Sequence, residues 1–363
     1  MRILILALVL FATTAPQLKW RTETPARGTP AIDEAAIYFL TRAGDLVRVT
    51  RGGIETWRRR VGDGSADISG GTVLVADDVV VAGDYDVVAV GRADGAPRWR
   101  FHPVDGYGPG LYLGAIADGL VFAGSPSGRV YAIDLRTGDA RWSRLVGPSD
   151  RSTAFRPVVD GGGVYVGYTD FTTRPAGGVI ALDPVSGREL WRAAFPARRP
   201  VSPGTGLAGG PLVDASAVVA ADAEGIVFAF DRASGSALWS IDDASAVSAG
   251  GAEFRALAIA RRTLIATSMN GLVTAYDLGT RVRRWQYDGR PLGSPAFQLA
   301  ASAGLVFVPY PGAGVVALDA IDGREVWRAG AGARGAMWPP LVSGDDLYVA
   351  SSDGVLAYAR SDR

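Results

Sequence analysis

At 363 residues the chain is long enough for two or three ordinary domains, or for one large repeat domain. Lys+Arg and Asp+Glu both number 37, so net charge does not point to nucleic acid or to an anionic membrane surface. The sequence contains no cysteine, which excludes disulfides, thiolate metal ligands, cysteine nucleophiles and lipid attachment through an N-terminal cysteine.

The N-terminus has the form of a secretory signal. Arg2 supplies a short positive region, Ile3 to Phe11 form an apolar core, and Ala12 to Ala15 are small residues. We therefore predict a signal peptide over residues 1–15, a mature domain over residues 16–363, and a periplasmic or extracellular location. Cleavage after Ala15 would place Pro16 at the new N-terminus, so an uncleaved membrane anchor remains the alternative, and it is the only membrane contact that we predict.

One pattern recurs through the whole chain. In the stretch from Val179 to Trp191, VIALDPVSGRELW, a short apolar run is followed by a turn and by a second run that ends in tryptophan. Eight tryptophans stand in phase, 37 to 49 residues apart: Trp20, Trp57, Trp99, Trp142, Trp191, Trp239, Trp285 and Trp327. A repeat at this spacing indicates a solenoid, a propeller or a similar array.

The order of elements within a repeat predicts a four-stranded blade. Each unit has a short run that often opens with proline, an apolar strand, a third strand after a turn, and the tryptophan strand. The middle strands are apolar on both faces, as expected where each sheet packs between two neighbouring sheets. The sequence thus predicts an all-β propeller built from antiparallel blades of four strands.

The two ends of the chain predict how the ring closes. Three strands follow Trp327, beginning at Met337, Leu347 and Val355, and no tryptophan strand comes after them. At the other end, residues Gln17 to Glu23 form a tryptophan strand that no partner strands precede. We predict that this N-terminal strand completes the last blade, which closes the ring non-covalently and makes eight blades.

The long connections are expected to gather on one face of the disc. Most of them join a tryptophan strand to the next blade, and such loops share a face with the turns between the second and third strands. Loops carry binding sites more often than the scaffold does. This face, called the loop face below, is the predicted surface for partners.

The repeated polar residues have structural explanations. The aspartate eight residues before the tryptophan, as in Asp183, ends a strand, where its carboxylate can accept backbone N–H bonds from the turn. The glycine four residues before the tryptophan, as in Gly187, suits a left-handed backbone conformation. Arg281 occupies this glycine position in the sixth blade, which predicts a strained or different turn there.

The repeat A-x-D-x-x-[ST]-G-x-x-x-W resembles the pyrroloquinoline-quinone-type propeller repeat. Eight such blades are similar both to the quinoprotein alcohol dehydrogenases and to the BamB family of outer-membrane assembly scaffolds, over residues 17 to 360. The dehydrogenase resemblance implies a quinone covered by adjacent cysteines and a calcium ion, and the absence of cysteine departs from it. The BamB resemblance implies a lipid-anchored scaffold, and the missing N-terminal cysteine departs from that form of anchoring.

Five residues are candidate partner or channel-mouth binding positions. Trp338 is the tryptophan out of phase, and its ring could stack on a ligand or simply fill the end of the channel. Arg156 and Arg255 open first strands, where they could line the channel and bind an anion, or form ordinary ion pairs. Arg198 and Arg199 lie beside prolines in the longest loop, where they could dock a partner or remain solvated.

We therefore expect an exported, non-catalytic, monomeric scaffold that binds protein partners of the cell envelope through its loop face. No catalytic residue, metal or cofactor is predicted, and neither is a nucleic-acid partner. The alternative is a pyrroloquinoline-quinone-binding oxidoreductase or a sensor of that cofactor.

Overall fold

The structure is a computed structural model, and it describes residues 16–62, 71–83, 85–103, 110–147, 152–170, 176–196, 210–222, 225–243, 254–296, 298–330 and 337–359. The signal predicted for residues 1–15 lies outside these residues and stays a prediction. Within the described ranges no helix is both long and apolar enough to cross a membrane.

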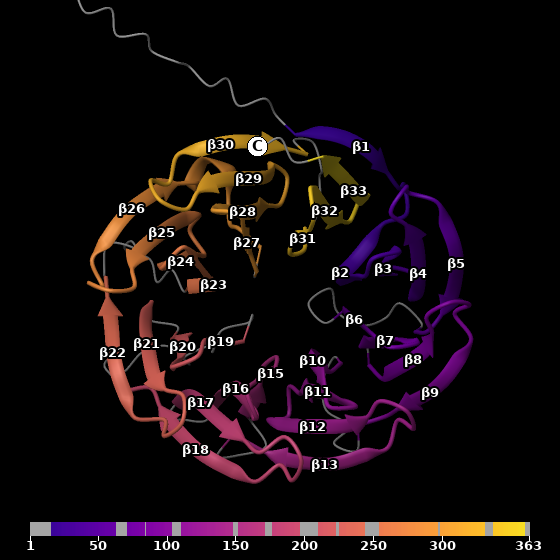
Figure 1. Ribbon diagram of the computed structural model, residues 1–363, viewed down its shortest axis with the longest axis horizontal. Helices are drawn as coiled ribbons and strands as arrows, with labels where there is room; N and C mark the ends of the chain where they lie inside the picture. Colours follow the sequence, from indigo (N-terminus) through magenta and orange to yellow (C-terminus); the bar gives the residue numbers. More distant parts are fainter. Residues whose placement is uncertain are drawn as a thin grey trace, which may run out of the picture.

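The described strands form antiparallel sheets, called blades, that are arranged around a central axis (Figure 1). The first sheets run from the N-terminal half: β2 (Ala26–Ile32), β3 (Ala36–Thr41), β4 (Asp45–Thr50), β5 (Glu55–Arg60); β6 (Thr72–Ala76), β7 (Val79–Gly83), β8 (Val87–Gly91), β9 (Pro97–Phe101); β10 (Tyr112–Ala117), β11 (Leu120–Gly124), β12 (Arg129–Asp134), β13 (Ala140–Leu145); β14 (Ser152–Ala154), β15 (Val158–Asp160), β16 (Gly163–Asp170), β17 (Ala176–Leu182), β18 (Glu189–Ala194).

The remaining sheets follow in chain order and include one short 3-10 helix, η1 (Arg290–Leu292). Their strands are β19 (Leu212–Val213), β20 (Ala217–Ala221), β21 (Ile226–Asp231), β22 (Ala237–Asp242); β23 (Phe254–Ala260), β24 (Thr263–Ser268), β25 (Leu272–Asp277), β26 (Arg283–Asp288); β27 (Ala300–Ser302), β28 (Leu305–Tyr310), β29 (Gly314–Asp319), β30 (Glu325–Ala329); β31 (Leu341–Ser343), β32 (Asp346–Ser351), β33 (Gly354–Ala359), with β1 (Gln17–Arg21).

Two sheets depart from the simple four-stranded form. The blade of β14 to β18 has its innermost strand in two pieces, because β14 and β15 both pair with β16. The blades of β2 to β5 and β6 to β9 are joined into one eight-stranded sheet by a parallel pairing of Thr29 with Thr72.

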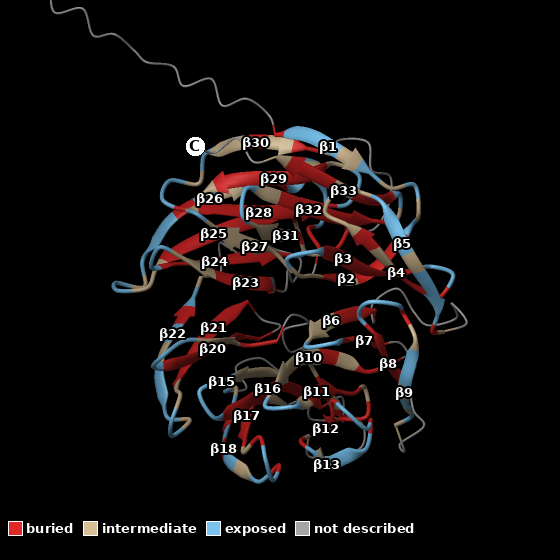
Figure 2. Ribbon diagram, turned by 45° about the vertical axis from the view of Figure 1, so that its right-hand side comes forward, coloured by how far each residue is buried: buried red, intermediate tan, exposed pale blue. Residues whose placement is uncertain are grey.

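Burial follows the position of a strand within its blade. The second and third strands, such as β7 (VVVAG) and β8 (VVAVG), are buried along their whole length, since each sheet packs against a neighbour on both faces. Their β-branched residues suit such a surface. The outer strands, such as β5 with its sequence ETWRRR, are largely exposed and form the pale-blue rim in Figure 2. The core therefore lies between blades and not along the axis.

The N-terminal strand joins the last sheet, as predicted. β1 pairs antiparallel with β33, with Leu18 opposite Tyr358 and Trp20 opposite Ala357. Lys19 Nζ forms an ion pair with Asp346 at 2.8 Å. The regular strand ends at Arg21, two residues before the predicted limit at Glu23.

A tryptophan and a glycine of successive blades meet at six boundaries between the described blades. A Cβ atom placed on Gly187, whose φ is +67°, would lie 2.7 Å from Cδ2 of Trp142 in the preceding blade. The indole Nε1 of Trp142 donates to the Pro184 carbonyl at 2.9 Å. The same ring-on-glycine contact pairs Trp20 with Gly53, Trp57 with Gly95, Trp99 with Gly138, Trp191 with Gly235 and Trp285 with Gly323. The position thus needs glycine for its backbone and for the neighbouring ring.

The sixth blade shows the predicted departure. Arg281 has a φ of +67° although it carries a side chain. Its guanidinium lies 4.7 Å from the ring centroid of Trp239, and its Nη1 donates to the Leu278 carbonyl. That carbonyl is the counterpart of those that accept the indole N–H in other blades, so Arg281 replaces both the glycine and the tryptophan hydrogen bond.

Candidate functional site

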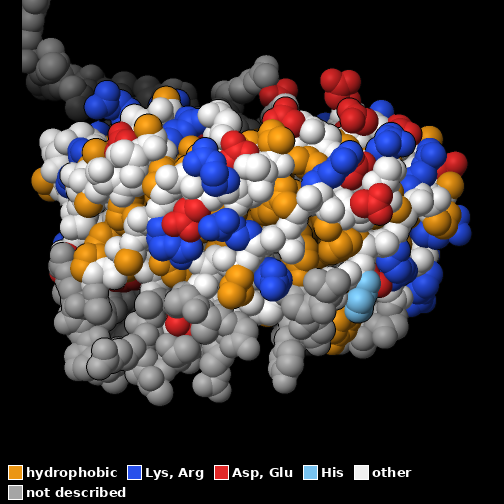
Figure 3. Space-filling view, turned by 90° about the horizontal axis from the view of Figure 1, so that it is seen from below, with side chains coloured by type: hydrophobic (Ala, Val, Ile, Leu, Met, Phe, Trp, Pro, Cys, Tyr) orange, Lys and Arg blue, Asp and Glu red, His pale blue; other side chains and the backbone are white. Residues whose placement is uncertain are grey.

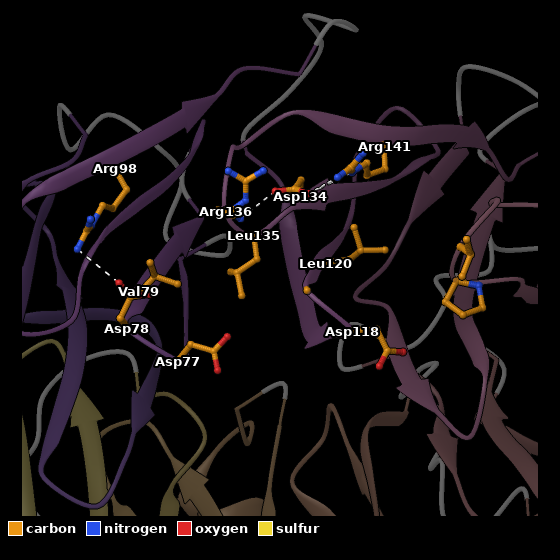
Figure 4. Close-up of a pocket in the computed structure, with 13 residues that line it drawn as sticks. Asp77, Asp78, Val79, Arg98, Asp118, Leu120, Asp134, Leu135, Arg136 and Arg141 are labelled. Carbon is orange, nitrogen blue, oxygen red and sulfur yellow. Dashed lines mark hydrogen bonds and ion pairs between the residues drawn. The ribbon is translucent and has the colours of Figure 1, made fainter.

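A groove among the described residues lies on the face opposite the loop face. Its cavity volume is about 800 Å³, and it crosses the blades of β6 to β9, β10 to β13 and β14 to β18 (Figure 4). The groove is lined by Asp77, Asp78, Val79, Arg98, Asp118, Gly119, Leu120, Asp134, Leu135, Arg136, Arg141, Pro184 and Val185.

Tight turns place the acidic side chains of this groove. Asp77 and Asp118 lie in the turns between the first and second strands of their blades, and both have positive φ, 49° and 50°. Asparagine, aspartate and glycine favour this conformation in two-residue hairpins. Within the described ranges neither carboxylate has an ion-pair partner. Figure 4 shows them on either side of the Leu135 side chain.

The floor of the groove is apolar and its edges are charged. Val79 and Leu135 are each 7% exposed, whereas Val185, at the edge, is 79% exposed. Arg98 approaches Asp78 at 3.5 Å across the exposed edge. An apolar floor between separated charges of both signs suits a protein segment better than a compact anion or a metal ion.

Asp134 explains how the repeated aspartate acts. Its Oδ1 accepts the backbone N–H groups of Arg136 and Thr137, and Arg141 Nη2 donates to Oδ2 at 2.6 Å. The Arg141 hydrogen bond and then the Thr137 N–H lower the pKa of this carboxyl to about 2. This confirms the turn-capping role and makes Asp134 part of the groove wall.

The outer rim carries charges of both signs. Figure 3 shows basic and acidic side chains interspersed there, with hydrophobic side chains between them. On the outer strands many are paired, as Arg192 with Glu189 at 3.0 Å and Arg328 with Glu325 at 2.9 Å. The rim in this view is mixed in charge.

Trp338 lies in the core between the last and first blades. Its side chain is 9% exposed and belongs to a cluster with Phe39, Val47 and Val355, packed against Trp20. Its backbone N–H donates to Ala350 O at 3.1 Å. The structure therefore gives the ring a packing role at the closing boundary, and a role in binding stays a prediction.

The four candidate arginines do not form one described cluster. Arg156 lies between β14 and β15, where Nη2 donates to Thr72 Oγ1 at 2.9 Å. The backbone of Arg255 lies in β23, at a shift of register between Phe254 and Ala256. Arg198 and Arg199 lie outside the described residues, so their docking role stays a prediction.

Sequence reasoning missed the groove, and its signal was weak. Asp118-Gly119 and Asp77-Asp78 are tight-turn dipeptides, and each precedes a buried strand. Their repetition in neighbouring blades could have indicated two acidic turns on one face. The apolar floor could not be predicted from these dipeptides, because Leu135 lies in a different turn, the one between the third and fourth strands of its blade.

Comparison with known proteins identifies relatives that match most or part of the chain. A profile of the family described as "Outer membrane protein assembly factor BamB" matches residues 9–173, 153–293 and 269–362. The BamB protein of Xanthomonas campestris is 30% identical over 221 residues, which cover 59% of this chain and 51% of that protein. The serine/threonine-protein kinase AfsK of Streptomyces coelicolor is 29% identical over 84% of this chain and 35% of the kinase.

A third relative is an enzyme. The polyvinylalcohol dehydrogenase of a Pseudomonas species is 31% identical over 180 residues, which cover 46% of this chain and 28% of the enzyme. The matched regions span 51% of the Xanthomonas BamB protein, 35% of the kinase and 28% of the dehydrogenase.

Solved structures support the fold. BamB from Moraxella catarrhalis superposes with a TM-score of 0.71 at 20% identity, covering 96% of this chain and 98% of that one. The computationally designed Ika8 protein gives a TM-score of 0.72 at 15% identity, covering 95% and 99%. With a family profile that matches nearly the whole chain, this all-β propeller belongs to the family described as outer membrane protein assembly factor BamB.

Proposed function

We propose that this chain is an exported, eight-bladed propeller that acts as a non-catalytic scaffold for protein partners in the cell envelope. The blade count is supported by five plain four-stranded sheets, by the sheet with the divided inner strand, and by the two halves of the eight-stranded sheet. Membership of the BamB family supports the envelope location and the scaffold role. The N-terminal segment supports export, and a monomer is expected because each blade is completed within the chain.

The observation that carries the proposal is the use of the repeated polar residues. Asp134 caps a turn and pairs with Arg141, while Gly187 and Trp142 seal a boundary between blades. These contacts recur around the ring, so the motif serves the fold. The blades differ in their surface residues, so a binding site is expected on the surface. The groove is one such surface, and its floor is apolar and open.

Two faces compete as the partner surface. The sequence favours the loop face, whose long connections lie mostly outside the described residues. On the opposite face, the groove between Val79 and Val185 can accept an apolar side chain flanked by charges. We propose that partners bind a face and not the rim, because rim charges pair with one another, as Arg192 does with Glu189.

Site-specific photo-crosslinking in cells tests this proposal. A photoreactive residue is placed at Val185 beside the groove, at Met269 on the loop face, and at Leu238 on the rim as the control; these are 79%, 43% and 50% exposed. We expect one discrete envelope-protein adduct from a face position and none from Leu238. Equal, diffuse labelling at all three positions would contradict a scaffold with a defined partner surface.

The alternative is a quinone-dependent oxidoreductase, favoured by the similarity to polyvinylalcohol dehydrogenase. The residues present do not fit that cofactor as the resemblance describes it, since no cysteine pair exists. Among the described residues no group of three or more His, Cys, Asp or Glu side chains could hold a metal ion. Absorbance titration with pyrroloquinoline quinone and calcium, with a dye-linked alcohol oxidation assay, decides the matter. Stoichiometric binding with turnover would overturn the scaffold proposal.

A further inference from the structure

The innermost strand of one blade is broken beside the ring axis. β14 pairs with the end of β16, as in Ala154 opposite Tyr168, and β15 pairs with its start, as in Val158 opposite Tyr165. Arg156 and Pro157 occupy the break. Proline has no N–H to give to a ladder, so the interruption follows from the sequence. The break therefore lies on the axis side of its blade, where inner strands such as β10 and β15 gather in Figure 1.

From this break Arg156 reaches a blade that is not its neighbour. Its Nη2 donates to Oγ1 of Thr72, the first residue of β6, at 2.9 Å. The strand β10 packs between β6 and β15, so the side chain spans the inner edge of the intervening blade. The strands are close here, because a Cβ atom on Gly114 of β10 would lie 2.0 Å from the Pro157 carbonyl oxygen. The guanidinium is thus held at a fixed place near the axis.

This arrangement has more hydrogen-bond donors than acceptors. The Nε of Arg156 is buried without a partner, and no carboxylate of the described residues pairs with the guanidinium. Thr72 is 2% exposed, and its oxygen already accepts from Arg156, so its own hydrogen is left to donate. Burial, with no compensating acid, lowers the pKa of Arg156 to about 10.

A desolvated cation without a counter-charge is costly to keep. Removing an ion from water is unfavourable, and a neutral threonine offsets little of that penalty. An anion would supply the missing counter-charge. Arg156 as a whole residue is intermediate in exposure, whereas its Nε is buried. A planar carboxylate matches the fork of a guanidinium in two parallel hydrogen bonds.

We propose that Arg156 and Thr72 form a binding site beside the ring axis for the carboxylate of a small organic anion. Arg156 supplies the charge and the fork, and Thr72 fixes the guanidinium and donates its hydroxyl hydrogen. In the sixth blade the backbone of Arg255 lies at the register shift of β23, an inner strand that also borders the axis.

The test compares malonate with sodium chloride at matched ionic strength, using the full-length protein. Thermal unfolding and isothermal titration calorimetry are measured for the wild type, Arg156→Gln and Arg156→Lys. The control is Arg42→Gln, which removes a charge from an exposed turn. We expect malonate to raise the melting temperature of wild type and of Arg42→Gln in a saturable way. The effect should be lost in Arg156→Gln and weaker in Arg156→Lys.

Stability without malonate gives a second readout. Because Arg156→Gln removes an uncompensated cation, this variant should unfold at the same temperature as wild type or above it. A purely structural role for the Thr72 hydrogen bond predicts the opposite, a less stable variant. No specific malonate effect in wild type, or an equal effect in Arg156→Gln, would overturn the site.

Discussion

The guanidinium of Arg281 lies 4.7 Å from the ring centroid of Trp239, at a position where other blades place a tryptophan on glycine. Arg281 adopts a φ of +67°, which costs an L-residue about 1–2 kcal/mol. The stacked cation offsets part of that strain, about 0.5–1 kcal/mol at an exposed site. This boundary is thus held by a different set of interactions from the six that pair a tryptophan with a glycine.

Arg281→Gly should stabilise the protein by about 1 kcal/mol, since glycine relieves the backbone and frees the Leu278 carbonyl for the Trp239 indole. Arg281→Ala should instead destabilise it, because alanine keeps the strain and loses the stacked cation. Urea unfolding of both variants checks this. If both variants shift stability in the same direction, strain and stacking are not the opposing forces described.

Gly187→Ala should destabilise the protein by more than the backbone cost alone. The added Cβ would meet Trp142 at 2.7 Å, and such overpacking costs about 1–3 kcal/mol beyond the left-handed backbone. Gly119→Ala is the matched control, since Gly119 has a φ of +72° and nothing within 4 Å of the added atom. Denaturant midpoints for the two variants measure the difference, and equal losses would show that the tryptophan contact is unimportant.

Much of this ring could be predicted because its strands and turns are specified by residues close together in the sequence. Proline, turn residues and apolar runs predicted the four strands, and the unmatched ends predicted that β1 would pair with β33. The absence of the repeat glycine at position 281 was enough to predict that the turn at Arg281 differs from the other turns. Contacts between repeats were harder to predict from the sequence, because they depend on how two blades pack. Trp142 contacts Gly187 of the next blade, and its indole donates to the Pro184 carbonyl there.

The candidate sites were harder to predict for the same reason. The position of Arg156 at the start of a strand predicts a place in the channel wall, and the structure adds the break in that strand and the hydrogen bond to Thr72. No local pattern links positions 72 and 156. Trp338 was chosen because it is out of phase, yet a tryptophan out of phase can also pack in the core.

Asp134 gives a pH-dependent prediction. Its folded pKa of about 2 is below the unfolded value of about 3.9, so its contribution to stability is present above pH 4 and lost as the pH falls toward 2. Asp134→Asn should therefore lower stability at pH 7, by about 1 kcal/mol or less because the pair is solvent-screened, and have little effect at pH 2.

Unfolding as a function of pH measures this effect, with Asp139→Asn in the same turn as the control. Asp139 is exposed, so its substitution removes a negative charge from the same turn and leaves the Asp134 cap in place. A constant difference between Asp134→Asn and wild type from pH 7 to pH 2 would count against the ionised cap.

The closed ring is the central claim, and it depends on β1. Trp20 Nε1 donates to Arg51 O at 2.7 Å, and the ring of Trp20 lies on Gly53. Removing residues 1–23 therefore deletes an outer strand and one boundary contact. Losing a tryptophan's packing alone costs about 3–5 kcal/mol, and each kcal/mol lowers the melting temperature of a domain of 150–250 residues by about 2–4 °C.

Strand complementation tests this most directly. Backbone hydrogen exchange in β33 is measured for the truncated protein, alone and with a peptide spanning residues 16–24, and the control peptide carries Trp20→Ala. We predict fast exchange and a lower melting temperature after truncation, both restored by the native peptide and not by the control. Slow exchange in β33 and an unchanged melting temperature in the truncated protein alone would contradict the closed ring.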